Sequence, residues 1–140
     1  MKEMESGYDH LLERISGAYT QGQSRAAQAV NTVLIETYWQ VGRHIVEFEQ
    51  GGQDRAGYGK ALLEQLARDL TLRHGKGFSR SNLNHMRLFY QFYPICEKVS
   101  HKLSWSHYVE LLKLDDGLER SFYERQAIAE QWSVPELRRQ

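Results

Sequence analysis

The feature that most constrains the fold is the stretch from Ser24 to Gln50, which contains no proline and one glycine, Gly42. Apolar residues recur in it every three or four positions, at Val30, Leu34, Tyr38, Val41, Ile45 and Phe48. This spacing predicts an α-helix, because residues three and four apart lie on the same helical face. Gly51 and Gly52 are expected to end the helix. At about 1.5 Å per residue it would be about 40 Å long.

The apolar face of this helix is wide. Ile35, Trp39 and Val46 form a second stripe about 100° around the axis from the first. A long helix with a wide apolar face is either a core strut of one chain or an interface between two chains. We therefore keep two expectations for Ile35, Trp39 and Val46, as core residues or as the interface of a homodimer.

Five further helices are predicted from apolar spacing and capping residues. They run from about Tyr8 to Tyr19, from Lys60 to Arg73 with a stop at Gly75, from Ser79 or Ser81 to Tyr93 before Pro94, from a cap at Ser104 to Leu114, and from a cap at Asp116. Ser133 and Glu136 predict one more helix start, with Glu three residues after the cap. No window alternates at period two, so we expect an all-α fold, a compact multi-helix domain with one long central helix.

Length and composition set the remaining bounds. The chain of 140 residues is 41% hydrophobic with 18 basic and 18 acidic residues, which fits one globular domain over residues 1–140. No apolar run is long enough to span a membrane and the first residues lack a secretory signal, so we expect a cytoplasmic protein. The last predicted helix opens at Ser133, barely two turns before Gln140, and we expect this domain to be the N-terminal module of a longer protein.

Nothing in the sequence predicts an active site. Gly59-Lys60 resembles a phosphate-binding loop only superficially, because Asp54 and Ala61 replace the required Gly and Ser or Thr. The six histidines do not pair at metal-binding spacing, and the single cysteine, Cys96, follows apolar residues, which favours an inert core thiol. We expect no catalytic residues, no metal and no cofactor.

The predicted helix from Ser79 to Tyr93 has two different faces. One is apolar, and the other carries side chains that can contact base edges, at Arg80, Asn84, Arg87 and Gln91. A helix and a glycine-containing turn precede it, as in a helix-turn-helix, and Lys76 and Arg73 could contact backbone phosphates. Residues 51–90 hold seven basic and three acidic groups, which also favours a polyanion such as DNA. The alternative is an ordinary solvent-facing side, because the turn is long and the net charge is zero.

A set of linked motifs carries a family resemblance. The motifs are Gly77-Phe78-Ser79, Asn82-Leu83, Met86-Arg87, Phe89-Tyr90, the segment from Leu103 to Tyr108, Phe122-Tyr123, and Trp132 to Val134 with Glu136 to Gln140. In this order the chain resembles the N-terminal domain of the bacterial YhcG-type family, a domain of unknown function. The resemblance implies a winged-helix or helix-turn-helix unit that precedes a nuclease-like domain of the PD-(D/E)XK type, which would lie beyond residue 140.

The resemblance implies a non-catalytic specificity or assembly module of a DNA-acting protein. Of the polar helix face only Arg87 belongs to the family motif. The alternative function is a protein interaction or dimerisation module that docks the nuclease-like domain or another partner. The segment from Leu103 to Tyr108 also keeps two interpretations, with Ser106 and His107 either contacting a phosphate or partner domain, or stabilising the fold.

Overall fold

The structure is a computed structural model that describes residues 2–51 and 61–140, with side chains from residue 7 onward. These residues form helices and contain no β-strand. The elements in chain order are α1 (Lys2–Glu49), α2 (Leu62–His74), α3 (Arg80–Phe92), the short 3-10 helix η3 (Cys96–Lys98), α4 (Trp105–Leu111), α5 (Gly117–Ala129) and α6 (Val134–Arg139). The prediction of an all-α fold with one long helix is confirmed.

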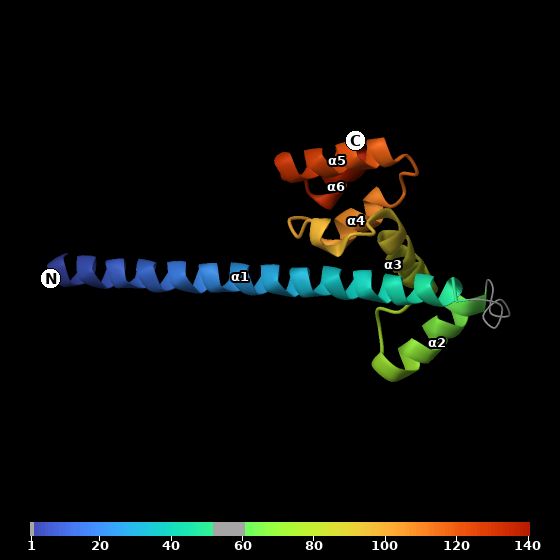
Figure 1. Ribbon diagram of the computed structural model, residues 1–140. Helices are drawn as coiled ribbons and strands as arrows, with labels where there is room; N and C mark the ends of the chain where they lie inside the picture. The colour runs from blue at the N-terminus through green and yellow to red at the C-terminus, as the bar shows by residue number, and fades with distance from the viewer. Residues whose placement is uncertain (1, 52–60) are drawn as a thin grey trace.

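The long helix is longer than the sequence predicted. The two helices expected over residues 8–19 and 24–50 are one continuous helix of 48 residues, α1. The residues between them include one glycine, Gly22, and no proline, and a single interior glycine costs only about 1 kcal/mol relative to alanine. The N-terminal half of α1 projects well beyond the other helices, which gather around its C-terminal half (Figure 1).

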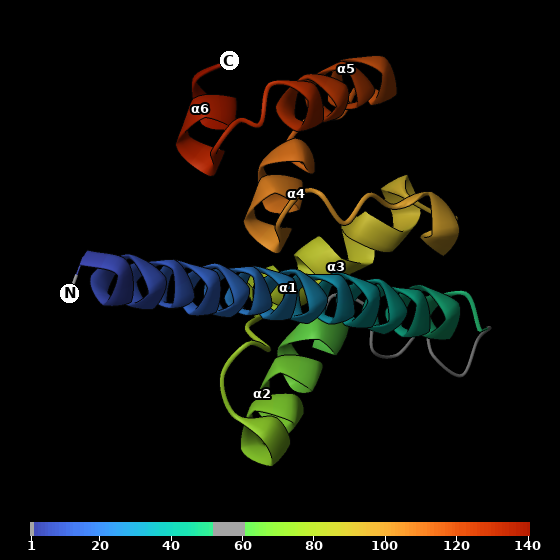
Figure 2. The same cartoon turned by 90° about the vertical axis from the view of Figure 1, so that its left-hand side faces the viewer.

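The core forms where α1 crosses α3. In Figure 2, α1 runs across the view, with α2 below it and α4, α5 and α6 above it. The cluster on the α4 side includes Ile35, Trp39, Phe89 and Tyr108, and the cluster on the α2 side is formed by Ile45, Leu62, Leu83 and Met86. Trp39 donates a hydrogen bond from Nε1 to the Tyr93 carbonyl at 2.7 Å, so its polar edge is satisfied inside the core.

The predicted caps begin the helices as expected. The side chains of four N-cap residues accept backbone N–H groups of the first turn, at Ser79, Ser104, Asp116 and Ser133. Gly75 ends α2 with a positive φ of 85°. The helix that follows Ser104 ends at Leu111 and not at Leu114, because the chain tightens after Leu111 into hydrogen bonds between residues three apart.

In the described ranges, no helix combines the length and the hydropathy that are needed to cross a lipid bilayer.

Candidate nucleic-acid interface

The turn between α2 and α3 is held in place by one amide side chain. Gly75 and Gly77 have positive φ angles of 85° and 108°, which let the backbone reverse between the helices. Asn82 donates from Nδ2 to the Gly77 carbonyl at 2.7 Å, and its Oδ1 accepts a hydrogen bond from Trp105 Nε1 at 2.9 Å. Asn82 therefore links the turn, the first part of α3 and α4, and it fixes where α3 begins.

The polar edge of α3 is only partly open to solvent. Leu83, Met86 and Phe89 are completely buried on the opposite side of the helix. Of the four residues predicted to read bases, Arg80 and Gln91 are exposed, whereas Asn84 and Arg87 are half-buried. The ends of this edge are accessible, and its middle is partly covered by the neighbouring helices.

Two glutamates from other helices face the arginines of this edge. The Arg87 Nε lies 2.6 Å from Glu49 Oε1 at the end of α1, in a hydrogen-bonded ion pair. Arg80 Nε lies 3.8 Å from Glu64 Oε1 of α2, and both side chains of this wider pair are 60% exposed. The sequence showed no acidic residue on the α3 face itself, but it could not show that α1 and α2 bring carboxylates to it. A phosphate bound here must compete with these carboxylates, most strongly at Arg87.

Two further cations predicted to contact phosphate lie at the start of the turn. Arg73 is in the last turn of α2, and Lys76 is in the turn itself, and both are exposed. His85, in the middle of α3, adds no charge near neutral pH, because burial and the nearby Lys113 lower the pKa of its imidazole. The accessible cations of this region are therefore Arg73, Lys76 and Arg80.

The residues predicted as core or dimer interface lie inside the chain's own core. Ile35, Trp39 and Val46 are 1%, 7% and 5% exposed. Ile35 and Trp39 belong to the core cluster on the α4 side. An interface between two copies would therefore use other side chains of α1.

The segment from Leu103 to Tyr108 has a structural role at the start of α4. His107 Nδ1 accepts the Ser104 backbone N–H at 3.1 Å, and its Nε2 lies 2.8 Å from the Trp132 carbonyl, which only a protonated Nε2 can donate to. Nδ1 is part of a capping box with Ser104, and Nε2 joins the start of α4 to the Trp132 carbonyl, so both ring nitrogens are engaged within the fold. Ser106 is exposed.

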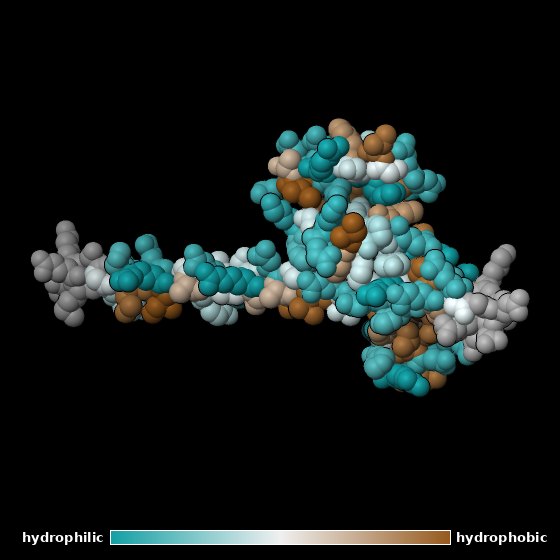
Figure 3. Space-filling model, viewed as in Figure 1, coloured by the Kyte–Doolittle hydropathy of each residue, from teal (hydrophilic) through white to brown (hydrophobic). Residues whose placement is uncertain are grey.

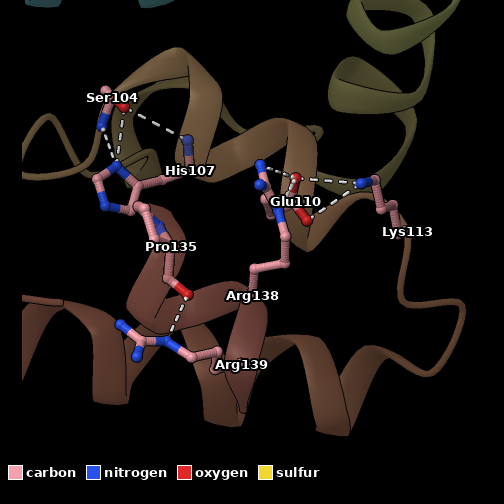
Figure 4. Close-up of polar contacts among 7 residues, drawn as sticks. All are labelled: Ser104, His107, Glu110, Lys113, Pro135, Arg138 and Arg139. Atoms are coloured by element: carbon pink, nitrogen blue, oxygen red, sulfur yellow. Dashed lines mark hydrogen bonds and ion pairs between the residues drawn. The ribbon is translucent and has the colours of Figure 1, made fainter. Parts of the chain in front are cut away.

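A polar cluster next to this cap ties α6 to α4 (Figure 4). Glu110 Oε1 accepts hydrogen bonds from Arg138 Nη2 at 2.9 Å and from Lys113 Nζ at 3.0 Å. The Glu110 side chain is 11% exposed, whereas both cations are 61% exposed. Burial raises the pKa of Glu110, but Arg138 and Lys113 outweigh burial and lower the pKa below 4.5. The Arg138–Glu110 pair joins α6 to α4, and the Lys113–Glu110 pair is local to the end of α4.

Two features of the structure were missed by sequence reasoning. An open groove of about 550 Å³ lies between α1 and α2, lined mainly by apolar side chains such as Val41, Phe48, Leu66 and Leu70. The projecting half of α1 exposes Tyr8, Leu11, Leu12, Ile15 and Tyr19, each at 49–68% of its surface. The signal for the second feature was present, because these residues recur at helical spacing on a helix that was predicted to be short.

The described residues contain no group of three or more His, Cys, Asp or Glu side chains that could hold a metal ion. Cys96 is partly buried, and burial with the nearby Glu97 and Glu36 raises the pKa of its thiol, so the thiolate is disfavoured. The described residues present an exposed helix edge, an exposed turn and an exposed apolar side of a helix.

Comparisons with known proteins agree with the family resemblance that the sequence motifs indicated. The DUF1016 N-terminal domain matches residues 14–140 of the chain. A protein of Escherichia coli (strain K12) named "Putative nuclease YhcG" is 35% identical over 168 aligned positions, which cover 96% of this chain and 44% of the relative. The chain thus spans less than half the length of that relative. No solved structure matches the chain. The chain belongs to the family of the DUF1016 N-terminal domain.

Proposed function

We propose that this domain binds duplex DNA, as a specificity or assembly module of a PD-(D/E)XK-type nuclease, and that it does not itself cut. The cutting residues would belong to a C-terminal nuclease-like domain in the same cytoplasmic protein. The observation that carries the proposal is that Arg80 and Gln91 are exposed along one edge of α3, and Lys76 in the turn before it, while Leu83, Met86 and Phe89 on the apolar side of α3 are completely buried. The relationship to a protein named as a nuclease supports DNA as the polyanion.

The proposed DNA contacts are of two kinds, contacts to phosphates and contacts to base edges. Arg73, Lys76 and Arg80 would neutralise phosphates, because they are exposed cations around the turn. Gln91 and the partly covered Asn84 offer paired donors and acceptors to a base edge. Arg87 would join the complex by exchanging Glu49 for a phosphate or a guanine. With about four phosphates neutralised, the slope of log affinity against log salt should be about −3.6.

The test is a salt titration of duplex binding, followed by fluorescence anisotropy. Arg80→Ala and Lys76→Ala should each weaken binding and reduce the salt slope by about 0.9, because each removes one phosphate contact. Arg125→Ala is the matched control, since Arg125 is an exposed arginine on α5. Equal affinities for all three variants would overturn the assignment of this edge. A duplex RNA of the same sequence that binds more tightly would replace DNA as the ligand.

A second candidate function, protein interaction, is favoured by the projecting half of α1. This half of α1 lies apart from the other described helices (Figure 1), and its apolar side chains are exposed. Contiguous exposed apolar side chains are typical of surfaces that bind another protein. The two functions use different surfaces, α1 for interaction and α3 for DNA, so one domain can have both.

A further inference from the structure

Eight exposed uncharged residues of α1 follow a seven-residue repeat. Along one side of the helix they are spaced alternately by four and three positions, at Tyr8, Leu12, Ile15, Tyr19, Gly22, Ala26, Ala29 and Val33. All eight are exposed. Figure 3 shows apolar side chains along the underside of the projecting helix, and charged and polar side chains along its top. This spacing is the pattern by which one helix packs against another in a coiled coil.

The sizes of the eight side chains change along the helix. The first four are large, whereas Gly22, Ala26 and Ala29 are the smallest side chains available. A second copy that packed in the parallel direction would place Tyr19 against Tyr19 and Gly22 against Gly22. The tyrosines would crowd each other, and the glycines would leave a void. In the antiparallel direction, each large side chain lies opposite a small one, in the pairs Tyr8 with Val33, Leu12 with Ala29, Ile15 with Ala26, and Tyr19 with Gly22.

We propose that a second copy of this chain packs antiparallel along this stripe, residues 8–33 of α1. The proposal rests on the interaction function proposed above and names its partner. The stripe needs a partner helix with large side chains opposite its small ones, and the same stripe in reverse direction has that order. Such an interface is isologous, with its two-fold axis between Thr20 and Gln21.

Charge and direction are compatible with this pairing. None of the eight positions is charged, and the rest of residues 7–34 carries two acidic and two basic groups, Asp9 and Glu13 against Arg14 and Arg25. Antiparallel helices also place opposite ends of their dipoles together. Because Val33 lies opposite Tyr8, the packed helices of the two copies, which contact α1 from Asn31 onward, lie towards opposite ends of the pair.

The first experiment is sedimentation velocity on the 140-residue chain. We expect a species of twice 16.4 kDa for the natural sequence, and a monomer for Leu12→Glu, which puts a charge in the stripe. Leu72→Glu is the matched control, because Leu72 is an 87% exposed leucine on α2, and it should remain a dimer. A natural chain that stays monomeric up to the millimolar range would overturn the inference, and would leave the stripe to another partner, such as the nuclease-like domain.

The second experiment tests the direction, in a Cys96→Ser background that removes the natural thiol. Leu12→Cys combined with Ala29→Cys should form covalent dimers on mild oxidation, and each single variant should not. Within one helix the two positions are about 25 Å apart, at about 1.5 Å per residue, which no disulfide can bridge. Cross-linking of Leu12→Cys alone would show a parallel pair and overturn the antiparallel assignment.

A third variant separates packing from helix stability. Gly22→Leu favours helix formation, because leucine is a better helix former than glycine. It should nevertheless raise the dissociation constant of the dimer at least tenfold, because the leucine fills the space that Tyr19 of the second copy needs. Gly17→Leu, between the levels of Ile15 and Tyr19 and away from the stripe, should leave the dimer unchanged. Tighter association of Gly22→Leu would contradict the size pairing. The salt titration of DNA binding by Leu12→Glu tests the DNA proposal separately from the dimer. If this variant keeps the salt slope of the natural chain, the DNA proposal stands even when no dimer is found.

Discussion

Gly42 of α1 lies directly against the backbone of Met86 in α3. A Cβ atom added at Gly42 would overlap the Met86 carbonyl oxygen and lie 2.7 Å from the carbonyl carbon. The two helices can cross this closely only because residue 42 has no side chain. The same crossing brings Trp39 and Ile45, on either side of Gly42, into the two core clusters.

We predict that Gly42→Ala destabilises the chain by about 1–3 kcal/mol, although alanine is the better helix former. The physical reason is that α1 and α3 must move apart and loosen both clusters. Urea unfolding followed by tryptophan fluorescence measures the change. Gly17→Ala is the control, because a Cβ there meets nothing within 4 Å. An unchanged or higher stability of Gly42→Ala would contradict the close approach.

Asn82→Asp is predicted to destabilise the turn between α2 and α3. An aspartate can still accept the hydrogen bond from Trp105, but it cannot donate to the Gly77 carbonyl, which is 2.7 Å from Asn82 Nδ2. The expected loss is about 0.5–1.5 kcal/mol at neutral pH, the usual net contribution of one hydrogen bond, because the Gly77 carbonyl is exposed and water can replace the donor. Hydrogen exchange of the amides around residues 75–79 should accelerate. Asn84→Asp, on the polar edge of the same helix, serves as the control for an added charge.

The ion pairs of Glu110 predict an acid-dependent loss of stability. The pKa of Glu110 is below 4.5 in the folded chain, so its stabilisation is present above that value and is lost as the pH falls through the folded-state pKa. Glu110→Gln should therefore be less stable than the natural chain near neutral pH, by up to about 1 kcal/mol. The difference should shrink in acid, where the natural side chain becomes neutral. Thermal unfolding over a pH series measures it, and a constant difference would show that Arg138 and Lys113 do not act through charge.

Release of Arg87 from its glutamate should strengthen DNA binding. Glu49→Gln removes the carboxylate 2.6 Å from Arg87 Nε and makes the guanidinium available to a phosphate. We expect tighter duplex binding and a salt slope steeper by about 0.9, which corresponds to one added contact. Glu47→Gln is matched in charge and helix, but Glu47 pairs with Arg43 within α1 at 2.8 Å, so it should have a smaller effect. Equal gains from both variants would indicate a general charge effect.

Local signals in the sequence were sufficient for most of the fold. Ser79, Ser104, Asp116 and Ser133 begin their helices as predicted, because a capping bond involves residues only two or three apart. The join at Gly22 was missed, since a glycine weakens a helix without deciding whether it ends.

The candidate site was less predictable, because it depends on contacts between distant segments. Arg87 and Glu49 are 38 residues apart, and no local pattern indicates that they meet. Nor could spacing show whether the apolar residues Ile35 and Trp39 face their own chain or a second one. Helical periodicity identifies an apolar side but not what covers it.

Because α1 is one continuous helix, it fixes the distance and the direction between its projecting half and the point where α3 crosses. No bend separates the projecting half from Gly42, where α3 crosses, so any partner that fixes the first half also fixes the direction of α3. In the antiparallel pair proposed above, the two Gly42 levels are about 65 Å apart at about 1.5 Å per residue, close to two turns of B-form DNA. Adding or removing residues in the projecting half would change that span in steps and would also rotate the two α3 helices relative to each other.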